Sequence, residues 1–333
     1  MGTNRARGAA IGAVLAGVVG LGLLVAPGGA GAAPELPPVG AEELVASVLT
    51  AEPGPFGGAV QVDSALGLPA LPDLPQVADG TSTARVWSDG EGRGRVQLPT
   101  DSAEKTIVDD GTTLWHYDSA GGTVSRSAHP DRSRDAAAAA DPTALAAGLV
   151  ERLRATSTVA VDGTAEVAGR PAYELVLAPA PTERTLLREV RIAVDAERRV
   201  PLRLTVLGNG ATEPALQAGF TDVEFVPQDP ALFTFTPPPG ATVEQHTAPA
   251  GRPDGAGDEP TVVGDGWDTV VVAALPDGGE VAPELGALGT PVSGEWGRGR
   301  LVTTAVAGAI VTDDGRVAAG AVPEQVLTEA LGR

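Results

Sequence analysis

Short segments in which apolar and polar residues alternate recur along this chain, and they constrain its fold more than any other feature. A period of two places successive side chains on opposite faces of a strand. The clearest pair, Lys105–Asp109 and Thr112–Asp118, is separated by Asp110-Gly111, which is a strong hairpin signal. The connections between most of these segments are too short for crossover helices, so we expect an antiparallel sheet.

Six further segments and two helices complete the predicted first region. The strands are Thr83–Ser88, Arg93–Leu98, Ala172–Leu177, Val190–Val194, Pro201–Leu207 and Leu216–Phe225. Helical spacing of apolar residues predicts helices at Ala41–Thr50 and Asp141–Ala155. A sheet of eight or more strongly twisted strands curls, and its concave face must be filled by side chains, helices or a ligand. The sequence therefore predicts an α+β fold: a curved antiparallel sheet, an unclosed half-barrel, covered by helices over residues 41–244.

A linker and a second, smaller region follow. Residues 245–260 are rich in Gly, Pro, Ala and Asp, as linkers often are. In residues 261–333, Trp267–Ala274 is an apolar segment that predicts a strand, and Gly299–Ala305 with Ala307–Thr312 predicts a hairpin. Pro323–Leu331 predicts a terminal helix, so we expect a small C-terminal α+β appendage.

The first 33 residues have the order of a secretory signal peptide. Arg5 and Arg7 precede the uncharged apolar stretch Ala9–Ala26, and the small residues Ala30-Gly31-Ala32 follow. The alternative is an uncleaved N-terminal anchor, because the stretch has about the minimum length that spans a bilayer. Residues 1–33 therefore predict an extracytoplasmic protein, either in the cell envelope or secreted, and the uncleaved alternative would anchor it to the membrane from that side.

Charge and residue types exclude several functions. The chain has 43 acidic and 23 basic residues, a net charge of −20, which argues against a nucleic-acid partner. It has no Cys, and its three His, at positions 116, 129 and 246, lack metal-ligand spacing. The sequence also lacks a nucleophile elbow and a Walker lysine. We therefore expect no enzyme, no cofactor and no metal.

The remaining chemical feature is a set of apolar side chains on the predicted strands, which form either a plain core or the wall of a lipid cavity. Trp115 and Tyr117 share one face of their strand, and we expect this face to point inward because it is bulkier than that of Leu114 and His116. Burying an acyl chain of 16 carbons would contribute about 12 kcal/mol, at roughly 0.8 kcal/mol per CH₂. The predicted lining residues are Trp87, Val96, Leu98, Trp115, Tyr117, Tyr173, Leu175, Leu177, Ile192 and Val194. The predicted lid residues, on the helix at 141–155, are Leu145, Leu149 and Leu153.

Two stretches resemble the LolA-like extracytoplasmic lipoprotein carriers. One is Glu104–Asp118, EKTIVDDGTTLWHYD, and the other is Leu232–Val243, LFTFTPPPGATV. The two predicted helices occur in the family's order, and the resemblance covers Glu42–Glu244. It implies a half-barrel whose concave apolar face, under helices, receives acyl chains. The arginine that ties the lid shut in proteobacterial carriers is absent, and Arg93 is only a displaced substitute.

A half-barrel followed by a small C-terminal domain also resembles the RseB/MucB regulators, which bind an anti-sigma factor. Gly266-Trp267 and Val317–Val322 are similar to parts of that C-terminal domain. Three hypotheses follow. The first is a carrier that receives lipid or lipoprotein acyl chains from a membrane-protein donor. The second is an envelope-stress regulator that binds an anti-sigma ectodomain. The third is a structural envelope protein without a ligand.

Overall fold

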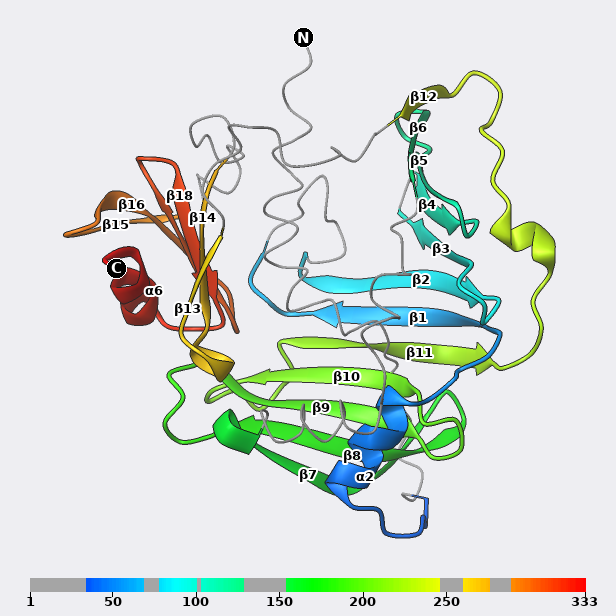
Figure 1. The fold of residues 1–333 in the computed structure, drawn as a ribbon, viewed down its shortest axis with the longest axis horizontal. Helices are drawn as coiled ribbons and strands as arrows, with labels where there is room; N and C mark the ends of the chain where they lie inside the picture. The colour runs from blue at the N-terminus through cyan, green and yellow to red at the C-terminus, as the bar shows by residue number, and fades with distance from the viewer. Residues whose placement is uncertain (1–33, 69–77, 101–102, 129–153, 246–259, 276–288) are drawn as a thin grey trace.

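The computed structural model describes residues 34–68, 78–100, 103–128, 154–245, 260–275 and 289–333, and it contains two sheets (Figure 1). The first has 12 strands in the order β12-β6-β5-β4-β3-β2-β1-β11-β10-β9-β8-β7. The second has 6 strands in the order β13-β14-β18-β17-β16-β15. Within the described residues, all neighbouring strands pair antiparallel except β12 and β6, which pair parallel.

The bounds of the elements in the first region are α2 Ala41–Leu49, β1 Phe56–Ser64, β2 Gly80–Ser88, β3 Gly94–Pro99, β4 Glu104–Asp109, β5 Thr113–Asp118, β6 Thr123–Ala128, β7 Ser157–Val167, β8 Arg170–Pro179, β9 Leu187–Asp195, β10 Pro201–Gly208, β11 Leu216–Glu224, the 3-10 helix η2 Pro230–Phe233 and β12 Thr242–Gln245. In the second region they are β13 Thr261–Val263, the 3-10 helix η3 Gly266–Asp268, β14 Val270–Ala274, β15 Thr290–Gly294, β16 Gly297–Thr303, β17 Gly308–Thr312, β18 Arg316–Gly320 and α6 Glu324–Leu331.

The predicted hairpin at Asp110-Gly111 is confirmed as the turn between β4 and β5. Gly111 has φ +90°, a left-handed conformation that glycine adopts at low cost. The carboxylate of Asp110 accepts hydrogen bonds from the backbone N–H groups of Thr112 and Thr113, at 2.9 and 2.8 Å. A local polar side chain therefore holds the turn, and the turn sets the register in which Ile107 pairs with His116.

Strand β1 joins the two halves of the large sheet, and its glycines are required there. It pairs with β2 on one side and β11 on the other, with an irregularity in register between Ala59 and Val60. A Cβ on Gly58 would lie 2.4 Å from the carbonyl oxygen of Asp222 and 2.9 Å from the ring of Phe220. Only glycine allows the strands to approach so closely at this bulge.

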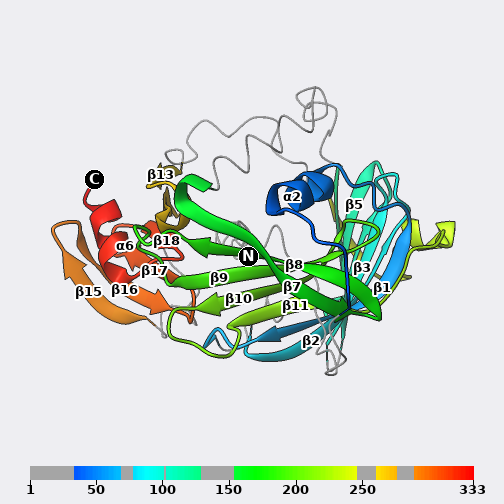
Figure 2. The same ribbon diagram turned by 90° about the horizontal axis from the view of Figure 1, so that it is seen from below.

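Helix α2 lies on the concave face of the curved sheet, against β7 to β9 (Figure 2). Its Leu44 and Val45 are buried against Tyr173, Leu175 and Val194 of β8 and β9. Ala41 and Val48 pack on the same cluster, and with Leu44 and Val45 they recur at helical spacing, so the helix buries one stripe. α2 therefore closes one end of the concave face.

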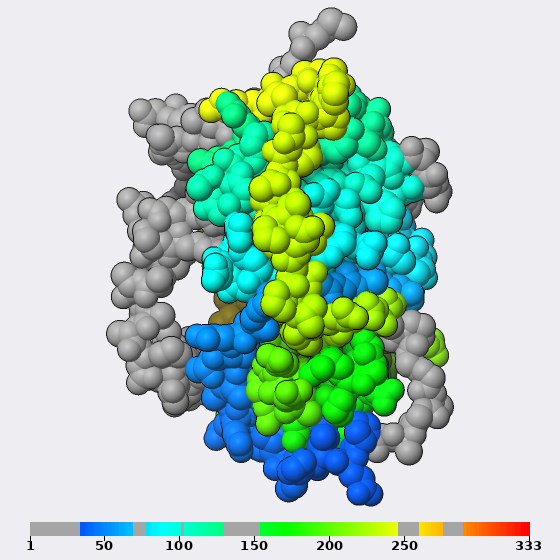
Figure 3. All heavy atoms as spheres, turned by 90° about the vertical axis from the view of Figure 1, so that its right-hand side faces the viewer, coloured from blue at the N-terminus to red at the C-terminus, as the bar shows by residue number. Residues whose placement is uncertain are grey.

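The convex face of the sheet is covered by a different part of the chain, residues 226–241. Figure 3 shows this segment running across β2 to β6 on the outer side of the molecule. It contains η2, whose first N–H groups are capped by Asp229, which accepts a hydrogen bond from the N–H of Ala231 at 2.9 Å. Phe233 of this segment is 1% exposed. The outer face thus has an apolar cover of its own.

The second sheet packs α6 on one face, around Val270, Ile310, Val322 and Leu327. It is docked on the large sheet through polar and apolar contacts. The indole Nε1 of Trp267 donates a hydrogen bond to Ser157 at 2.6 Å. A buried apolar group made by both regions lies beside this contact: Leu187, Val206, Ala215 and Val306.

The α+β fold class, with a curved, unclosed antiparallel sheet, is confirmed. One detail of the C-terminal expectation differs. The strand predicted from Trp267 begins at Val270, because Gly266–Asp268 forms η3 and turns the Trp267 side chain towards β7. The predicted signal segment, residues 1–33, and most of the predicted helix Asp141–Ala155 lie outside the described residues, as does most of the linker.

Candidate ligand pocket

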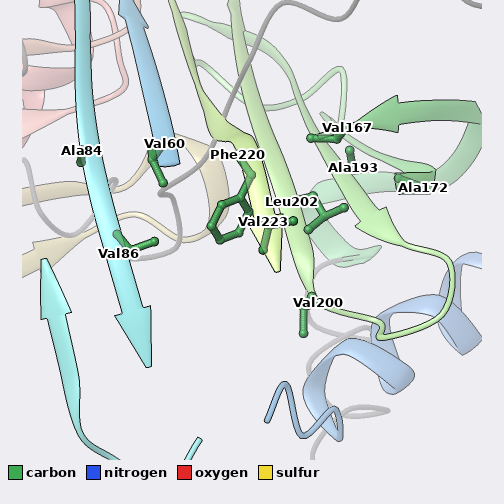
Figure 4. Packing of buried hydrophobic residues seen from close by; sticks show 10 residues of the cluster. All are labelled: Val60, Ala84, Val86, Val167, Ala172, Ala193, Val200, Leu202, Phe220 and Val223. Carbon is green, nitrogen blue, oxygen red and sulfur yellow. The ribbon is translucent and has the colours of Figure 1, made fainter. Parts of the chain in front are cut away.

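An apolar pocket of about 470 Å³ opens on the concave side of the large sheet. Figure 4 shows Val86, Val200 and Phe220, which line it, together with neighbouring buried residues. The full set of lining residues is Pro53, Phe56, Val86, Trp87, Gly94, Arg95, Val96, Ile107, Asp109, Val200, Pro201, Phe220 and Phe225.

The register of β2, β3 and β4 builds one wall of the pocket. Val86 is paired with Val96, and Val96 with Ile107, so the three side chains form an apolar row on one face of the sheet. Each residue comes from a strand with period-two alternation, which places the polar neighbours Arg85 and Gln97 on the other face. This wall therefore follows directly from the alternation in the sequence.

Three phenylalanine rings build the opposite wall. Phe56 lies 6.0 Å from Phe220 in an edge-to-face arrangement and 6.1 Å from Phe225, measured between ring centroids. Phe56 begins β1, Phe220 lies in β11, and Phe225 follows the end of β11. The close approach of the two strands at Gly58 brings these rings together, and edge-to-face pairs contribute about 0.5–1.5 kcal/mol beyond burial.

A turn rich in arginine, residues 195–200, lies at the mouth of the pocket. The guanidinium groups of Arg170 and Arg198 lie 5.0 and 5.5 Å from the centroid of the Phe225 ring. Asp195 is fully buried and pairs with Arg170. Burial raises the pKa of Asp195, but the hydrogen bonds from Arg170 and from the backbone N–H groups of the turn outweigh it, so the pKa is lowered overall. Asp195 therefore stays ionised and holds the turn in place.

The register divides the predicted lining residues between the two faces of the sheet. Val96 and Leu98 lie on the concave face, and so do the members on β8 and β9: Tyr173, Leu175, Leu177, Ile192 and Val194. Trp87, Trp115 and Tyr117 lie on the convex face. Of the whole predicted set, Trp87 and Val96 border the pocket. The lid residues Leu145, Leu149 and Leu153 lie outside the described residues.

The inward orientation expected for Trp115 and Tyr117 is wrong. Trp115 is paired with Val108 and Tyr117 with Thr106, on the face opposite to Ile107 and the pocket. Both rings pack against Phe235 of the 226–241 segment, with centroids 5.6 and 6.0 Å away. The bulky face of β5 points outward because a distant segment covers it there.

Two polar contacts anchor this outer cluster. The Nε1 of Trp115 donates a hydrogen bond to Asp110 at 2.9 Å. Burial raises the pKa of Asp110, but hydrogen bonds from Trp115, from Thr112 and from two backbone N–H groups outweigh it and lower the pKa to about 2. Arg93, the displaced substitute for the lid arginine, pairs with Asp89 at 2.5 Å and lies 5.4 Å from the ring centroid of Phe233. Arg93 therefore contacts the 226–241 segment that covers the outer face.

The predicted residues on β8 and β9 are covered by α2. Tyr173, Leu175 and Val194 are each at most 5% exposed and form one cluster with Leu44 of the helix. The Tyr173 hydroxyl donates a hydrogen bond to the carbonyl oxygen of Pro37 at 2.9 Å. These side chains stabilise the attachment of α2 in this structure and do not line the pocket.

The predicted lining set does not include five residues that line the pocket: Phe56, Val86, Ile107, Phe220 and Phe225. Val86 and Ile107 occupy the same face of their strands as Val96, so their alternation could have identified them. Phe56 directly precedes Gly57-Gly58, and glycine is unfavourable in strands, so the sequence pattern did not predict β1. The sequence holds no signal for the contact between Phe56 and Phe225.

Neither a metal site nor a membrane-spanning helix is found in the part of the chain that the structure describes. It contains no group of three or more His, Asp or Glu side chains arranged to hold a metal ion. Among the same residues, no helix is long and apolar enough to cross a membrane.

No protein-family model matches the chain, and no curated protein matches it significantly. Among solved structures, the chain is similar to MucB in the MucA/MucB complex of Pseudomonas aeruginosa, with 18% identity, 87% of this chain and 96% of that chain covered, and a TM-score of 0.49. It is also similar to an uncharacterized conserved protein from Thermus thermophilus, with 14% identity and a TM-score of 0.39. That match covers 62% of this chain and 99% of the other. A LolA superfamily protein from Nitrosomonas europaea matches with 13% identity and a TM-score of 0.24. That match covers 60% of this chain and 99% of the other. These likenesses concern the fold, and they include both groups whose motifs the sequence resembles.

Proposed function

We propose that this protein is an extracytoplasmic binding protein that holds an acyl chain of a lipid or lipoprotein in the concave pocket, without covalent catalysis. The observation that carries the proposal is the apolar pocket itself, about 470 Å³ and lined by Phe56, Val86, Val96, Ile107 and Phe220. Its volume lies within the range of about 300–1,000 Å³ that is typical of small-molecule sites.

The energetics of this pocket suit an acyl chain. Burying about ten methylene groups contributes roughly 8 kcal/mol, at about 0.8 kcal/mol each. Before the costs of association, this corresponds to a dissociation constant in the micromolar range. The costs of association make the net affinity weaker than this, and a carrier must release its cargo as well as bind it. The predicted export segment and the LolA-like motifs are consistent with this role.

Mass spectrometry of organic extracts tests the proposal on protein purified from its own host. We expect co-purified lipid, and a higher melting temperature when lipid is added back. Val96→Trp, which places an indole in the pocket, should reduce the amount of bound lipid severalfold. Gln97→Trp, on the other face of the same strand, is the matched control and should bind normally. Lipid-free wild-type protein with no thermal response to lipid would refute the proposal.

A second candidate function, a regulator that binds an anti-sigma ectodomain, has its own supporting observation. Strand β13 is an edge of the second sheet, and its Val262 is 63% exposed. An edge strand offers unpaired backbone groups to a strand of a partner protein. Crosslinking in host envelopes should then recover a membrane-protein ectodomain, and Val262→Pro should abolish its recovery. Recovery that Val262→Pro leaves unchanged would exclude this edge as the binding surface.

The third hypothesis, a structural envelope protein without a ligand, predicts a concave face filled by side chains. The pocket favours the two binding hypotheses over it.

A further inference from the structure

The turn at the pocket mouth carries a positive charge that the protein's own carboxylates do not neutralise. Of the two acids in this turn, Asp195 pairs with Arg170, and Glu197 also pairs with Arg170, at 3.2 Å. Among the residues that the structure describes, none forms an ion pair with Arg198. Arg198 is exposed, and it lies beside the Phe225 ring of the pocket wall.

The position of Arg198 is built by the fold. Its backbone N–H donates a hydrogen bond to the buried carboxylate of Asp195 at 2.5 Å, and the N–H of Glu197 donates to the same oxygen at 2.9 Å. The next residue, Arg199, has φ +60°, a left-handed conformation that is uncommon for a residue other than glycine. This turn directs Arg198 over the ring of Phe225, a residue of the pocket wall.

Apolar and cationic groups are thus adjacent at one site. Val200 and Pro201, directly after the turn, line the pocket with Phe225. A ligand whose chain fills the pocket can emerge beside the ring of Phe225, and the Arg198 guanidinium lies 5.5 Å from the centroid of that ring. A planar guanidinium donates two parallel hydrogen bonds to a carboxylate or phosphate.

We propose that Arg198 binds the anionic head of an amphiphile whose acyl chain occupies the pocket. This inference rests on the proposed function and specifies its ligand class: a single-chain or multi-chain lipid with a carboxylate or phosphate near the first carbons. Neutral lipids of the same chain length bind more weakly, because they lack the charge-assisted hydrogen bonds.

The test compares ligands that have the same chain and different heads. Laurate and dodecyl phosphate are anionic, and monolaurin is neutral. Each competes with the neutral fluorophore N-phenyl-1-naphthylamine for the full-length protein at pH 8. We expect Arg198→Gln to weaken laurate and dodecyl phosphate roughly five- to tenfold, as for a partly exposed charge-assisted contact, and to leave monolaurin within twofold. Arg198→Lys should restore part of the loss, and high salt should reduce the wild-type preference.

Arg298→Gln is the matched control, because Arg298 is an 83% exposed arginine of the second sheet. It should change no affinity. Equal weakening of all three ligands by Arg198→Gln would show that Arg198 only packs on Phe225 and would overturn the inference. Unchanged binding of both anionic ligands would overturn it as well, with the acyl-binding function intact. If wild-type protein binds none of the three, the proposed function itself fails, and this inference fails with it.

Discussion

Replacing Asp195 by Asn should destabilise the protein strongly, because this carboxylate organises the turn at the pocket mouth. Asp195 is fully buried and accepts hydrogen bonds from Nε and Nη2 of Arg170, the latter at 3.2 Å, and from the N–H groups of Glu197 and Arg198. Asn has almost the same volume, but one oxygen becomes an NH₂ group, which cannot accept these bonds. The substitution also leaves Arg170 without its principal counter-charge.

The magnitude follows from the burial of the pair. Removing one partner of a fully buried ion pair costs about 3–5 kcal/mol. The Arg170 side chain is 25% exposed, so water compensates part of the loss, and we expect a decrease of about 2–4 kcal/mol in the free energy of unfolding. Asp313→Asn is the matched control. Asp313 lies 3.6 Å from Arg298, and the two side chains are 64% and 83% exposed, so less than about 1 kcal/mol should be lost.

The pH dependence gives an independent check. The folded-state pKa of Asp195 is lowered below its ordinary value of 3.8. A lowered pKa of an acid contributes stability that is present above the unfolded-state pKa and is lost as the pH falls through the folded-state pKa. Urea denaturation should therefore show a constant difference between wild type and Asp195→Asn from pH 7 to 5, and a smaller difference below about pH 4. A loss no larger than that of Asp313→Asn, or a difference that grows on acidification, would refute the reasoning.

Two further predictions concern the outer cover and the contact between the sheets. Phe233→Ala should lower the free energy of unfolding by about 3–5 kcal/mol, because Phe233 is 1% exposed and lies under Arg93. A loss below about 1 kcal/mol, measured by urea denaturation, would mean that the 226–241 segment contributes little to stability. Trp267→Phe removes the 2.6 Å hydrogen bond to Ser157 and should lower the free energy of unfolding by about 0.5–1.5 kcal/mol. Hydrogen exchange should then accelerate at the backbone N–H of Leu186, which donates to the carbonyl oxygen of Ala321 across the same contact. Unchanged exchange at Leu186 would contradict this role of Trp267.

Alternation, turn residues and helical spacing predicted the elements that are formed by residues close together in the sequence. The β4–β5 hairpin follows from alternation around Asp110-Gly111, and α2 follows from apolar spacing over Ala41–Thr50. Strands whose sequence contains a breaker were not predicted. β1 contains Gly57-Gly58, and β7 contains Asp162-Gly163, which has the composition of a hairpin turn. In the structure the latter pair lies at an irregularity in register where Gly163 has φ +90°, so strand pairing overrides the local preference.

The site was predicted only in part, for a physical reason. Alternation identifies which side chains share a face, but it carries no information about which face is concave. Bulk suggested that Trp115 and Tyr117 point inward, and Val96 was assigned to the same cavity. Val96 pairs with Ile107, whose neighbour Val108 pairs with Trp115, so the two groups necessarily face opposite ways. Following the register from strand to strand would have revealed this inconsistency.

The outer cover also bears on why a pocket exists on the inner face. A sheet with apolar side chains on both faces needs an apolar partner on each. On the outer face the 226–241 segment is that partner, with Phe233 buried and Phe235 packed against Trp115. On the inner face α2 covers β8 and β9, whereas Val86, Val96 and Ile107 line the pocket of about 470 Å³ that the described residues form. Trp115 and Tyr117, which a ligand cavity was expected to use, pack against the protein's own Phe235, whereas an aliphatic row and three phenylalanines line the pocket in which we propose that an acyl chain binds.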